Sequence, residues 1–102
     1  MKKLLSLLLF VVLAGCAEKQ EVFDPTALFK QAEESMVKGS YEKARKDYQE
    51  IQEKAPDRSY APALMLRIAD TYFGEEKYDE ARVEYQAFLN YHPVNKDAAY
   101  AQ

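Results

Sequence analysis

The chain has 102 residues, of which 14 are Lys or Arg and 17 are Asp or Glu, so its formal charge is −3 at pH 7. This length suits one small domain, and the excess of acid argues against a nucleic-acid partner, because phosphate binding needs a basic face. The sequence has a single cysteine, which excludes a disulfide within the chain.

The amino terminus has the pattern of an export signal. Lys2 and Lys3 form a short cationic region, and an apolar stretch broken only by Ser6 follows them up to Ala14. That stretch is too short to cross a bilayer, which takes roughly 20 residues of helix. We therefore expect residues 1–15 to be a signal peptide, whose removal changes the formal charge from −3 to −5.

The end of this segment, Leu-Ala-Gly-Cys from Leu13 to Cys16, resembles the lipobox of bacterial lipoproteins. The resemblance implies cleavage before Cys16, diacylation of that cysteine and acylation of the new amino terminus. Residues 16–24 are expected to form the lipidated cysteine and a tether. Ala17 rather than Asp follows the cysteine, which favours a lipid anchor in the outer membrane with the domain facing the periplasm. The alternative for Cys16 is a small apolar residue at the end of an uncleaved anchor, or a free thiol.

Helical start and stop signals begin at residue 24. Asp24 is a good N-cap and Pro25 suits the first helical position, so we predict a helix over 25–38. Gly39 is expected to turn the chain and Ser40 to cap the next helix.

The second helix is predicted to run from residue 41 until Pro56 stops it. Two further helices are predicted over 59–73 and 77–91, with Pro93 disfavouring helix at the residue before it. No segment alternates with the period of a strand. The prediction is an all-α fold of antiparallel helical hairpins. The inner face of the second helix should carry residues spaced by three or four, which are Tyr41, Ala44, Tyr48 and Ile51.

The sequence repeats itself after 37 residues. Tyr-Glu-Lys-Ala-Arg followed by Tyr-Gln, over 41–49, returns as Tyr-Asp-Glu-Ala-Arg followed by Tyr-Gln over 78–86. Such units bury their apolar faces by stacking on one another, and the stack commonly binds another chain rather than catalysing a reaction.

The repeats resemble the tetratricopeptide pattern of small and aromatic residues. The first unit is predicted over 25–58, and the second over 59–95 with a short insert at 59–61. Residues 96–102 would begin a third unit. The second unit departs from the pattern because Glu76 stands at the turn position that Gly39 fills in the first, with Gly74 two places earlier. The alternative is a generic helical hairpin without a family tie. The matching positions are Ala32, Gly39, Tyr41, Ala44, Tyr48 and Pro56, then Ala69, Tyr72, Tyr78, Ala81, Tyr85 and Pro93.

With the lipobox in front, the chain resembles the BamD family of outer-membrane assembly lipoproteins over nearly all of its mature length. The resemblance also rests on Tyr60-Ala61, on the run Leu-Arg-Ile-Ala-Asp-Thr-Tyr-Phe over 66–73, and on His92-Pro93. It implies a scaffold that binds unfolded outer-membrane proteins, a barrel-forming core subunit and other lipoproteins. Family members have more repeats than the two present here, so the chain looks like an amino-terminal fragment. The alternative is a tetratricopeptide lipoprotein that regulates cell-wall enzymes or assists pilus secretin assembly.

A peptide-binding groove is predicted on the first helix of each unit, which lines the concave face of such repeats. Any one of its apolar members could instead pack between helices. The candidates are Phe29, Glu33, Met36, Leu66, Asp70 and Phe73.

No catalytic, cofactor or metal site is predicted. The one histidine, His92, precedes a proline at a helix end, far in sequence from any nucleophile it could activate. The acid pairs at 33–34 and 75–76 have no His or Cys nearby to complete a set of metal ligands. We therefore expect a binding protein and not an enzyme.

Overall fold

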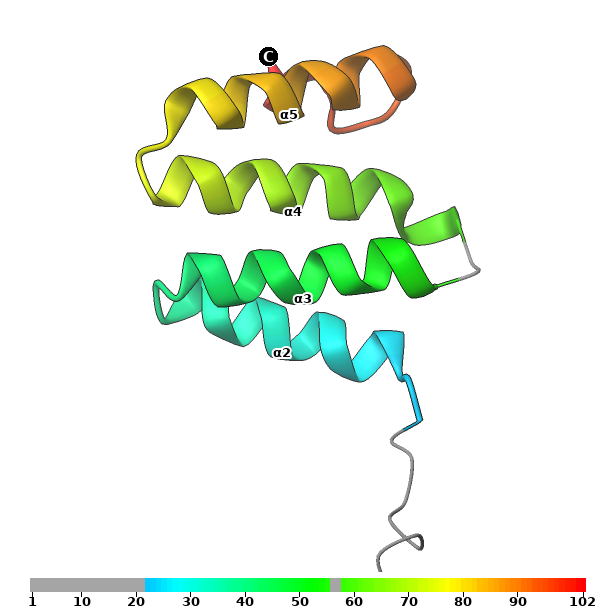
Figure 1. Ribbon diagram of the computed structural model, residues 1–102. Helices are drawn as coiled ribbons and strands as arrows, with labels where there is room; N and C mark the ends of the chain where they lie inside the picture. Colours follow the sequence, from blue (N-terminus) through cyan, green and yellow to red (C-terminus); the bar gives the residue numbers. More distant parts are fainter. Residues whose placement is uncertain (1–21, 56–57) are drawn as a thin grey trace, which may run out of the picture.

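The computed structural model describes residues 22–55 and 58–102, and every regular element within them is a helix. The helices follow one another as an antiparallel stack, in which α3, α4 and α5 lie side by side (Figure 1). The predicted all-α fold of stacked helical hairpins is confirmed. The elements are α2 Pro25–Val37, α3 Tyr41–Lys54, the short 3-10 helix η1 Arg58–Tyr60, α4 Ala61–Gly74, α5 Tyr78–Tyr91 and α6 Ala98–Ala101.

The amino-terminal end of α2 forms as its sequence predicts. The Asp24 carboxylate accepts a hydrogen bond from the Ala27 amide at 3.2 Å, and Pro25 occupies the first turn, where no amide donor is needed. The helix ends at Val37, one residue before the predicted end, because Gly39 adopts a left-handed conformation with φ 77°.

The two hairpin turns have the same backbone structure, 37 residues apart. In the first turn, the Ser40 amide donates to the Ser35 carbonyl at 2.8 Å; in the second, the Lys77 amide donates to the Tyr72 carbonyl at 2.9 Å. Glu76 has φ 62° and so takes the left-handed conformation that Gly39 takes in the first turn. The sequence repeat is therefore a structural repeat, although a residue with a Cβ occupies the second copy of the glycine position.

Ser40 occupies the N-cap position of α3, as predicted, but the predicted capping by its side chain is not found. Its side chain makes no capping hydrogen bond, and its backbone angles of −85° and 66° are not those of an extended N-cap. Lys77 has nearly the same angles, −87° and 69°, before α5, and a lysine side chain has no oxygen to offer. Both helices therefore begin without a side-chain cap, and the backbone hydrogen bonds of the preceding turn fix where each helix starts.

The connection between the hairpins also differs from the prediction. Residues 58–60 form η1, and α4 begins at Ala61 rather than at residue 59. Pro62 lies in the first turn of α4, where its fixed φ is compatible with a helix start.

Two apolar clusters hold the stack together. The first, between α2, α3 and α4, consists of Ala32, Ala44, Tyr48, Ile51, Leu64 and Ile68. The second, between α4, α5 and α6, consists of Leu66, Phe88 and Ala101. Ala32 and Ala44 are fully buried, which agrees with the predicted use of small residues where helices approach closely.

A glycine sets the distance between α3 and α4. A Cβ placed on Gly74 would lie 2.5 Å from ring atoms of Tyr41, closer than any van der Waals contact allows. The ring of Tyr41, at the start of α3, therefore packs directly against the backbone of Gly74 at the end of α4.

Three sequence predictions fall outside the described residues. The signal peptide over 1–15, lipidation of Cys16 and the helix stop at Pro56 stay predictions. Of the tether over 16–24, only the part from Val22 onward is described, and Val22 is 90% exposed. Among the helices of residues 22–55 and 58–102, none has both the length and the apolar character needed to cross a bilayer.

Candidate functional site

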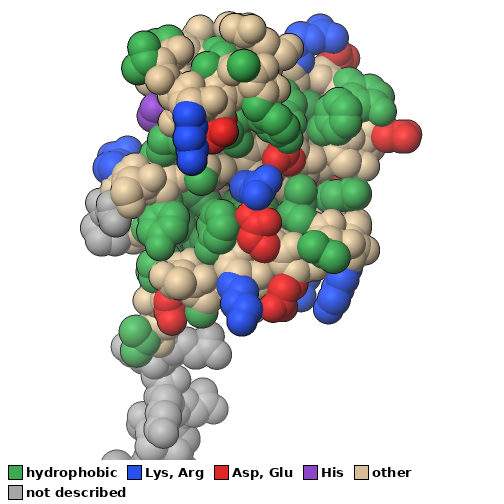
Figure 2. Space-filling view, turned by 180° about the vertical axis from the view of Figure 1, so that it is seen from behind, with side chains coloured by type: hydrophobic (Ala, Val, Ile, Leu, Met, Phe, Trp, Pro, Cys, Tyr) green, Lys and Arg blue, Asp and Glu red, His purple; other side chains and the backbone are tan. Residues whose placement is uncertain are grey.

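The face formed by α2 and α4 carries some of the predicted groove residues, among them Glu33 and Asp70, and charged side chains meet there. Figure 2 shows this face, with a basic and an acidic side chain in contact between two apolar areas. On this face, Arg67 of α4 donates through its Nε to Oε1 of Glu33 of α2 at 2.7 Å. This ion pair joins the first helix of one hairpin to the first helix of the next.

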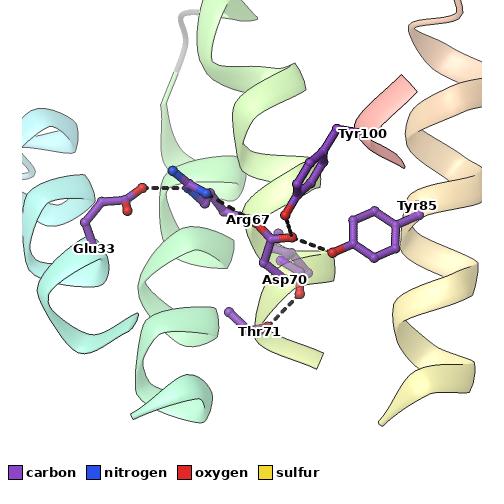
Figure 3. A network of polar contacts seen from close by, with 7 residues as sticks. Glu33, Arg67, Asp70, Thr71, Tyr85 and Tyr100 are labelled. Carbon is purple, nitrogen blue, oxygen red and sulfur yellow. Dashed lines mark hydrogen bonds and ion pairs between the residues drawn. The ribbon is translucent and has the colours of Figure 1, made fainter. Parts of the chain in front are cut away.

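Arg67 also binds a second carboxylate. Its Nη1 donates to Asp70 Oδ2 at 3.2 Å, so one guanidinium bridges Glu33 and Asp70 (Figure 3). The two acids occupy equivalent positions of the two repeats, 37 residues apart. The hydrogen bonds and negative charges of these carboxylates outweigh the effect of desolvation and raise the pKa of Arg67, which stays charged.

Asp70 is a shared acceptor at the centre of this arrangement. Its Oδ1 accepts from the Tyr100 hydroxyl of α6 at 2.7 Å and from the Tyr85 hydroxyl of α5. Side chains from four helices thus converge on one carboxylate, directly or through Arg67 (Figure 3). We call the five residues Glu33, Arg67, Asp70, Tyr85 and Tyr100 the polar network.

Both tyrosines of the network remain neutral hydrogen-bond donors at any physiological pH. Burial, followed by the hydrogen bond to Asp70, raises the pKa of Tyr85 and of Tyr100 above the ordinary value of 10.0. Their rings meet edge to face with centroids 6.2 Å apart. The network therefore fastens α6 to α4 and α5 by directional contacts as well as by packing.

The polar network has a formal charge of −1, because it holds two carboxylates and one guanidinium. The Arg67 side chain keeps 42% of its surface exposed, whereas that of Asp70 keeps only 11%. A ligand approaching this face would therefore meet the guanidinium and the Glu33 carboxylate first. Such a surface can exchange hydrogen bonds with the backbone and polar side chains of an extended peptide.

The apolar candidates of the predicted groove are divided among three environments. Phe29 and Met36 are half-buried and pack against the first core cluster, and the Phe29 ring lies 5.6 Å from that of Tyr48. Leu66 is only 7% exposed, because Phe88 and Ala101 cover it.

Phe73 is 56% exposed and lies edge to face with Tyr78, their centroids 5.2 Å apart. It lines a hollow of about 680 Å³ at the α5–α6 end of the molecule. The six predicted residues therefore do not form one continuous apolar groove. Glu33 and Asp70 are joined through Arg67, Leu66 belongs to the core, and Phe73 belongs to a separate surface.

Sequence reasoning did not identify Arg67, Tyr85 or Tyr100 as members of a site. The contact between Arg67 and Asp70 could have been predicted, because side chains three residues apart lie on the same face of a helix. The contact of Arg67 with Glu33 spans 34 residues and has no local signature.

The hydroxyl of Tyr48 is fully buried and has no hydrogen-bond partner among the described residues. Burial and the negative charge of Glu33 raise its pKa, so it stays neutral. Its neighbourhood is apolar on one side, where Phe29 packs, and charged on the other.

The single histidine of the sequence is His92. It follows α5, and its ring lies 5.6 Å from that of Phe88, which places it as a packing residue at the helix end. In the described ranges, no three His, Cys, Asp or Glu side chains come close enough together to hold a metal ion.

Comparisons with known proteins agree on one family. A family model described as YfiO, outer membrane lipoprotein, matches residues 22–102. The outer membrane protein assembly factor BamD of Rickettsia prowazekii (strain Madrid E) is 34% identical over 105 residues. That similarity covers 97% of this chain but 42% of the relative, so the chain spans less than half of the length of the protein it matches.

Proposed function

Because this chain belongs to the BamD family of outer-membrane lipoproteins, we propose that it assists the assembly of β-barrel proteins in the outer membrane as a non-catalytic scaffold. The observation that carries the proposal is the family match, which spans the whole carboxyl-terminal part of the chain from residue 22. The relative's name, an outer membrane protein assembly factor, favours this role over an adaptor for cell-wall enzymes or for a pilus secretin.

The proposed location is the outer membrane, with the helical stack in the periplasm and a lipid anchor at Cys16. The lipobox from Leu13 to Cys16 supports this location. Acyl chains contribute about 0.8 kcal/mol per buried methylene, so more than one chain on Cys16 would make release slow. The proposed partners there are a barrel-forming core subunit, other lipoproteins of the assembly complex, and unfolded outer-membrane proteins.

The proposed substrate-binding surface is the face of α2 and α4 around the polar network. Glu33 and Arg67 supply partly exposed charged groups, and Phe29 and Met36 supply partly exposed apolar surface beside them. This combination suits an extended polypeptide that has both apolar side chains and unpaired backbone groups. Leu66 is not part of the proposed surface, because α5 and α6 cover it.

Site-specific photocrosslinking in cells tests this proposal. We expect a photoreactive amino acid in place of Met36 on α2 to form adducts with newly made outer-membrane proteins. The matched control is the same amino acid in place of Gln49, an exposed residue on α3. Adducts of equal yield at both positions, or none at Met36, would contradict the proposed surface.

A further inference from the structure

Each hairpin has an acid on its first helix and a tyrosine on its second, and the two pairs differ in their contacts. Asp70 and Tyr85 of the second repeat stand 37 residues after Glu33 and Tyr48 of the first. The Tyr85 hydroxyl donates a hydrogen bond to Asp70 (Figure 3). Tyr48 is 0% exposed, yet its hydroxyl has no hydrogen-bond partner among the described residues. The same bond is therefore formed in the second repeat and open in the first.

The Tyr48 ring lies against the part of α2 that carries Glu33. Its centroid is 5.6 Å from that of Phe29, which precedes Glu33 by about one helical turn and so shares its face of α2. Burial, followed by the negative charge of Glu33, raises the pKa of Tyr48, and the positive charge of Arg67 opposes this shift. The hydroxyl therefore lies close to both members of the Glu33–Arg67 ion pair.

Glu33 is turned away from Tyr48 and toward the next hairpin. Its Oε1 accepts from Arg67 Nε at 2.7 Å, and 34% of its side chain is exposed, against 11% for Asp70. Glutamate is one methylene longer than aspartate, which gives Glu33 the reach for a partner on a neighbouring hairpin. Asp70 binds Arg67 as well, but it keeps the hydrogen bond of Tyr85.

An unpaired buried hydroxyl is unfavourable, because it has lost its hydrogen bonds to water without gaining others. A phenylalanine at position 48 would fill the same space beside Phe29 without this penalty. The hydroxyl therefore does not stabilise the arrangement that the structure shows. It would stabilise a second arrangement, in which Glu33 accepts from Tyr48 as Asp70 accepts from Tyr85.

We propose that the Glu33 carboxylate exchanges between two donors, the Arg67 guanidinium of the next hairpin and the Tyr48 hydroxyl of its own. In the first arrangement, which the structure shows, Glu33 ties α2 to α4. In the second, it is paired within its own hairpin. Tyr48 is thus a positioning residue that lets Arg67 leave the ion pair without leaving a partly buried carboxylate unpaired.

The exchange makes this contact between the two hairpins separable. Arg67 keeps 42% of its side chain exposed, so it has room to turn toward solvent when Glu33 releases it. Asp70 stays in place meanwhile, because Tyr85 and Tyr100 both donate to it. The inference concerns the pairing of these side chains in the protein alone and does not depend on the role in barrel assembly.

A double-mutant cycle on the full chain tests the exchange. We expect Tyr48→Phe to raise the midpoint of thermal unfolding by up to about 5 °C, or to leave it unchanged, because it removes an unpaired hydroxyl. In an Arg67→Met background, where Glu33 has only its second donor, Tyr48→Phe should instead lower the midpoint by about 4 °C or more.

The matched control for this cycle is Tyr85→Phe. It should lower the midpoint in both backgrounds, because the bond from Tyr85 to Asp70 does not wait for the loss of Arg67. A Tyr48→Phe effect of the same sign and size in the parent and in the Arg67→Met protein would overturn the proposal.

Glu33→Asp gives a second test that keeps Arg67. The shorter side chain matches that of Asp70 and should turn to Tyr48, so Tyr48→Phe should be destabilising in this background too. Crystal structures of the Arg67→Met and Glu33→Asp proteins should show the carboxylate of residue 33 within about 3 Å of the Tyr48 hydroxyl. A carboxylate that stays away from Tyr48 in both, or a water molecule bound to this hydroxyl in the parent and both variants, would show that Tyr48 does not position Glu33.

Discussion

A single residue determines how much backbone strain each hairpin turn carries, and Glu76 is the clearest case. It adopts φ 62°, a conformation in which a side chain costs roughly 1–2 kcal/mol because Cβ crowds the carbonyl oxygen. Gly39 meets the same backbone requirement at φ 77° without that cost. The second turn is therefore strained where the first is not.

We predict that Glu76→Gly stabilises the fold by about 0.5–1 kcal/mol, after allowing for the greater flexibility of glycine in the unfolded chain. Urea unfolding monitored by circular dichroism measures the change. The reciprocal variant Gly39→Glu should destabilise the protein by a similar amount. Equal stability of both variants and the parent would contradict the strain argument.

Glu75 makes stability depend on pH. The hydrogen bond and charge of Arg45 lower its pKa below the ordinary value of 4.5. A carboxyl group whose pKa is lower in the folded state stabilises the fold above its unfolded pKa, and this contribution is lost as the pH falls through the folded pKa. The Glu75 contribution should therefore be complete near neutral pH and decline below about pH 4.5.

Glu75→Gln should lower the free energy of unfolding at pH 7 and should flatten its decline between pH 4.5 and more acid values. Denaturant unfolding at a series of pH values provides the measurement. Glu34→Gln, which removes an exposed acid on α2, is the control and should leave the pH profile nearly unchanged. A profile for Glu75→Gln parallel to that of the parent would contradict this prediction.

At the scale of elements, the spacing between α3 and α4 depends on the fit of Tyr41 against Gly74. Alanine favours a helix over glycine by about 1 kcal/mol, so Gly74→Ala would stabilise α4 if no ring stood against it. With Tyr41 in place, the added Cβ overlaps the ring and must displace it. Intrinsic helix propensity and packing therefore act in opposite directions at this position.

A double-mutant cycle separates the two effects. We predict that Gly74→Ala is neutral or destabilising in the parent chain and stabilising, by up to about 1 kcal/mol, in a Tyr41→Ala background. Thermal unfolding of the four proteins gives the coupling free energy. Additive effects of the two substitutions would mean that the ring and the glycine do not restrict each other.

At the scale of the whole molecule, stability should be highest in the middle of the stack. The helices α3 and α4 are each covered by helices on both sides, whereas α2 and α5 are packed mainly against one hairpin partner. In a stack where each element contacts only its neighbours, stability is close to a sum of local and interface contributions. Helices with two covered faces should therefore open least often.

Native-state hydrogen exchange tests this distribution. Amides near Tyr48 in α3 and Ile68 in α4 are expected to exchange slowest, those of α5 faster, and those of α6 fastest. Asp70→Asn should increase exchange in α6 most, because it weakens the acceptor of Tyr100. Slower exchange in α5 than in α3 would contradict the expectation.

The sequence by itself determined the helices and their pairing into hairpins. The caps, the turn residues and the spacing of apolar positions act over a few residues, so they can be recognised without a fold. The start of α2 at Pro25 and the start of α3 at Tyr41 were predictable for this reason. The offset of 37 residues then predicted that two similar units would stack.

Only the tertiary structure decided which side chains meet and which remain accessible. Glu33 and Arg67 are 34 residues apart and pair because two hairpins stack, and Leu66 is lost from the predicted groove because α6 covers it. Arg45 and Arg82 have nearly the same neighbours in sequence, yet one is 8% exposed and the other has a side chain that is 78% exposed. The physical reason is that burial depends on the next helix in the stack, which local sequence does not encode.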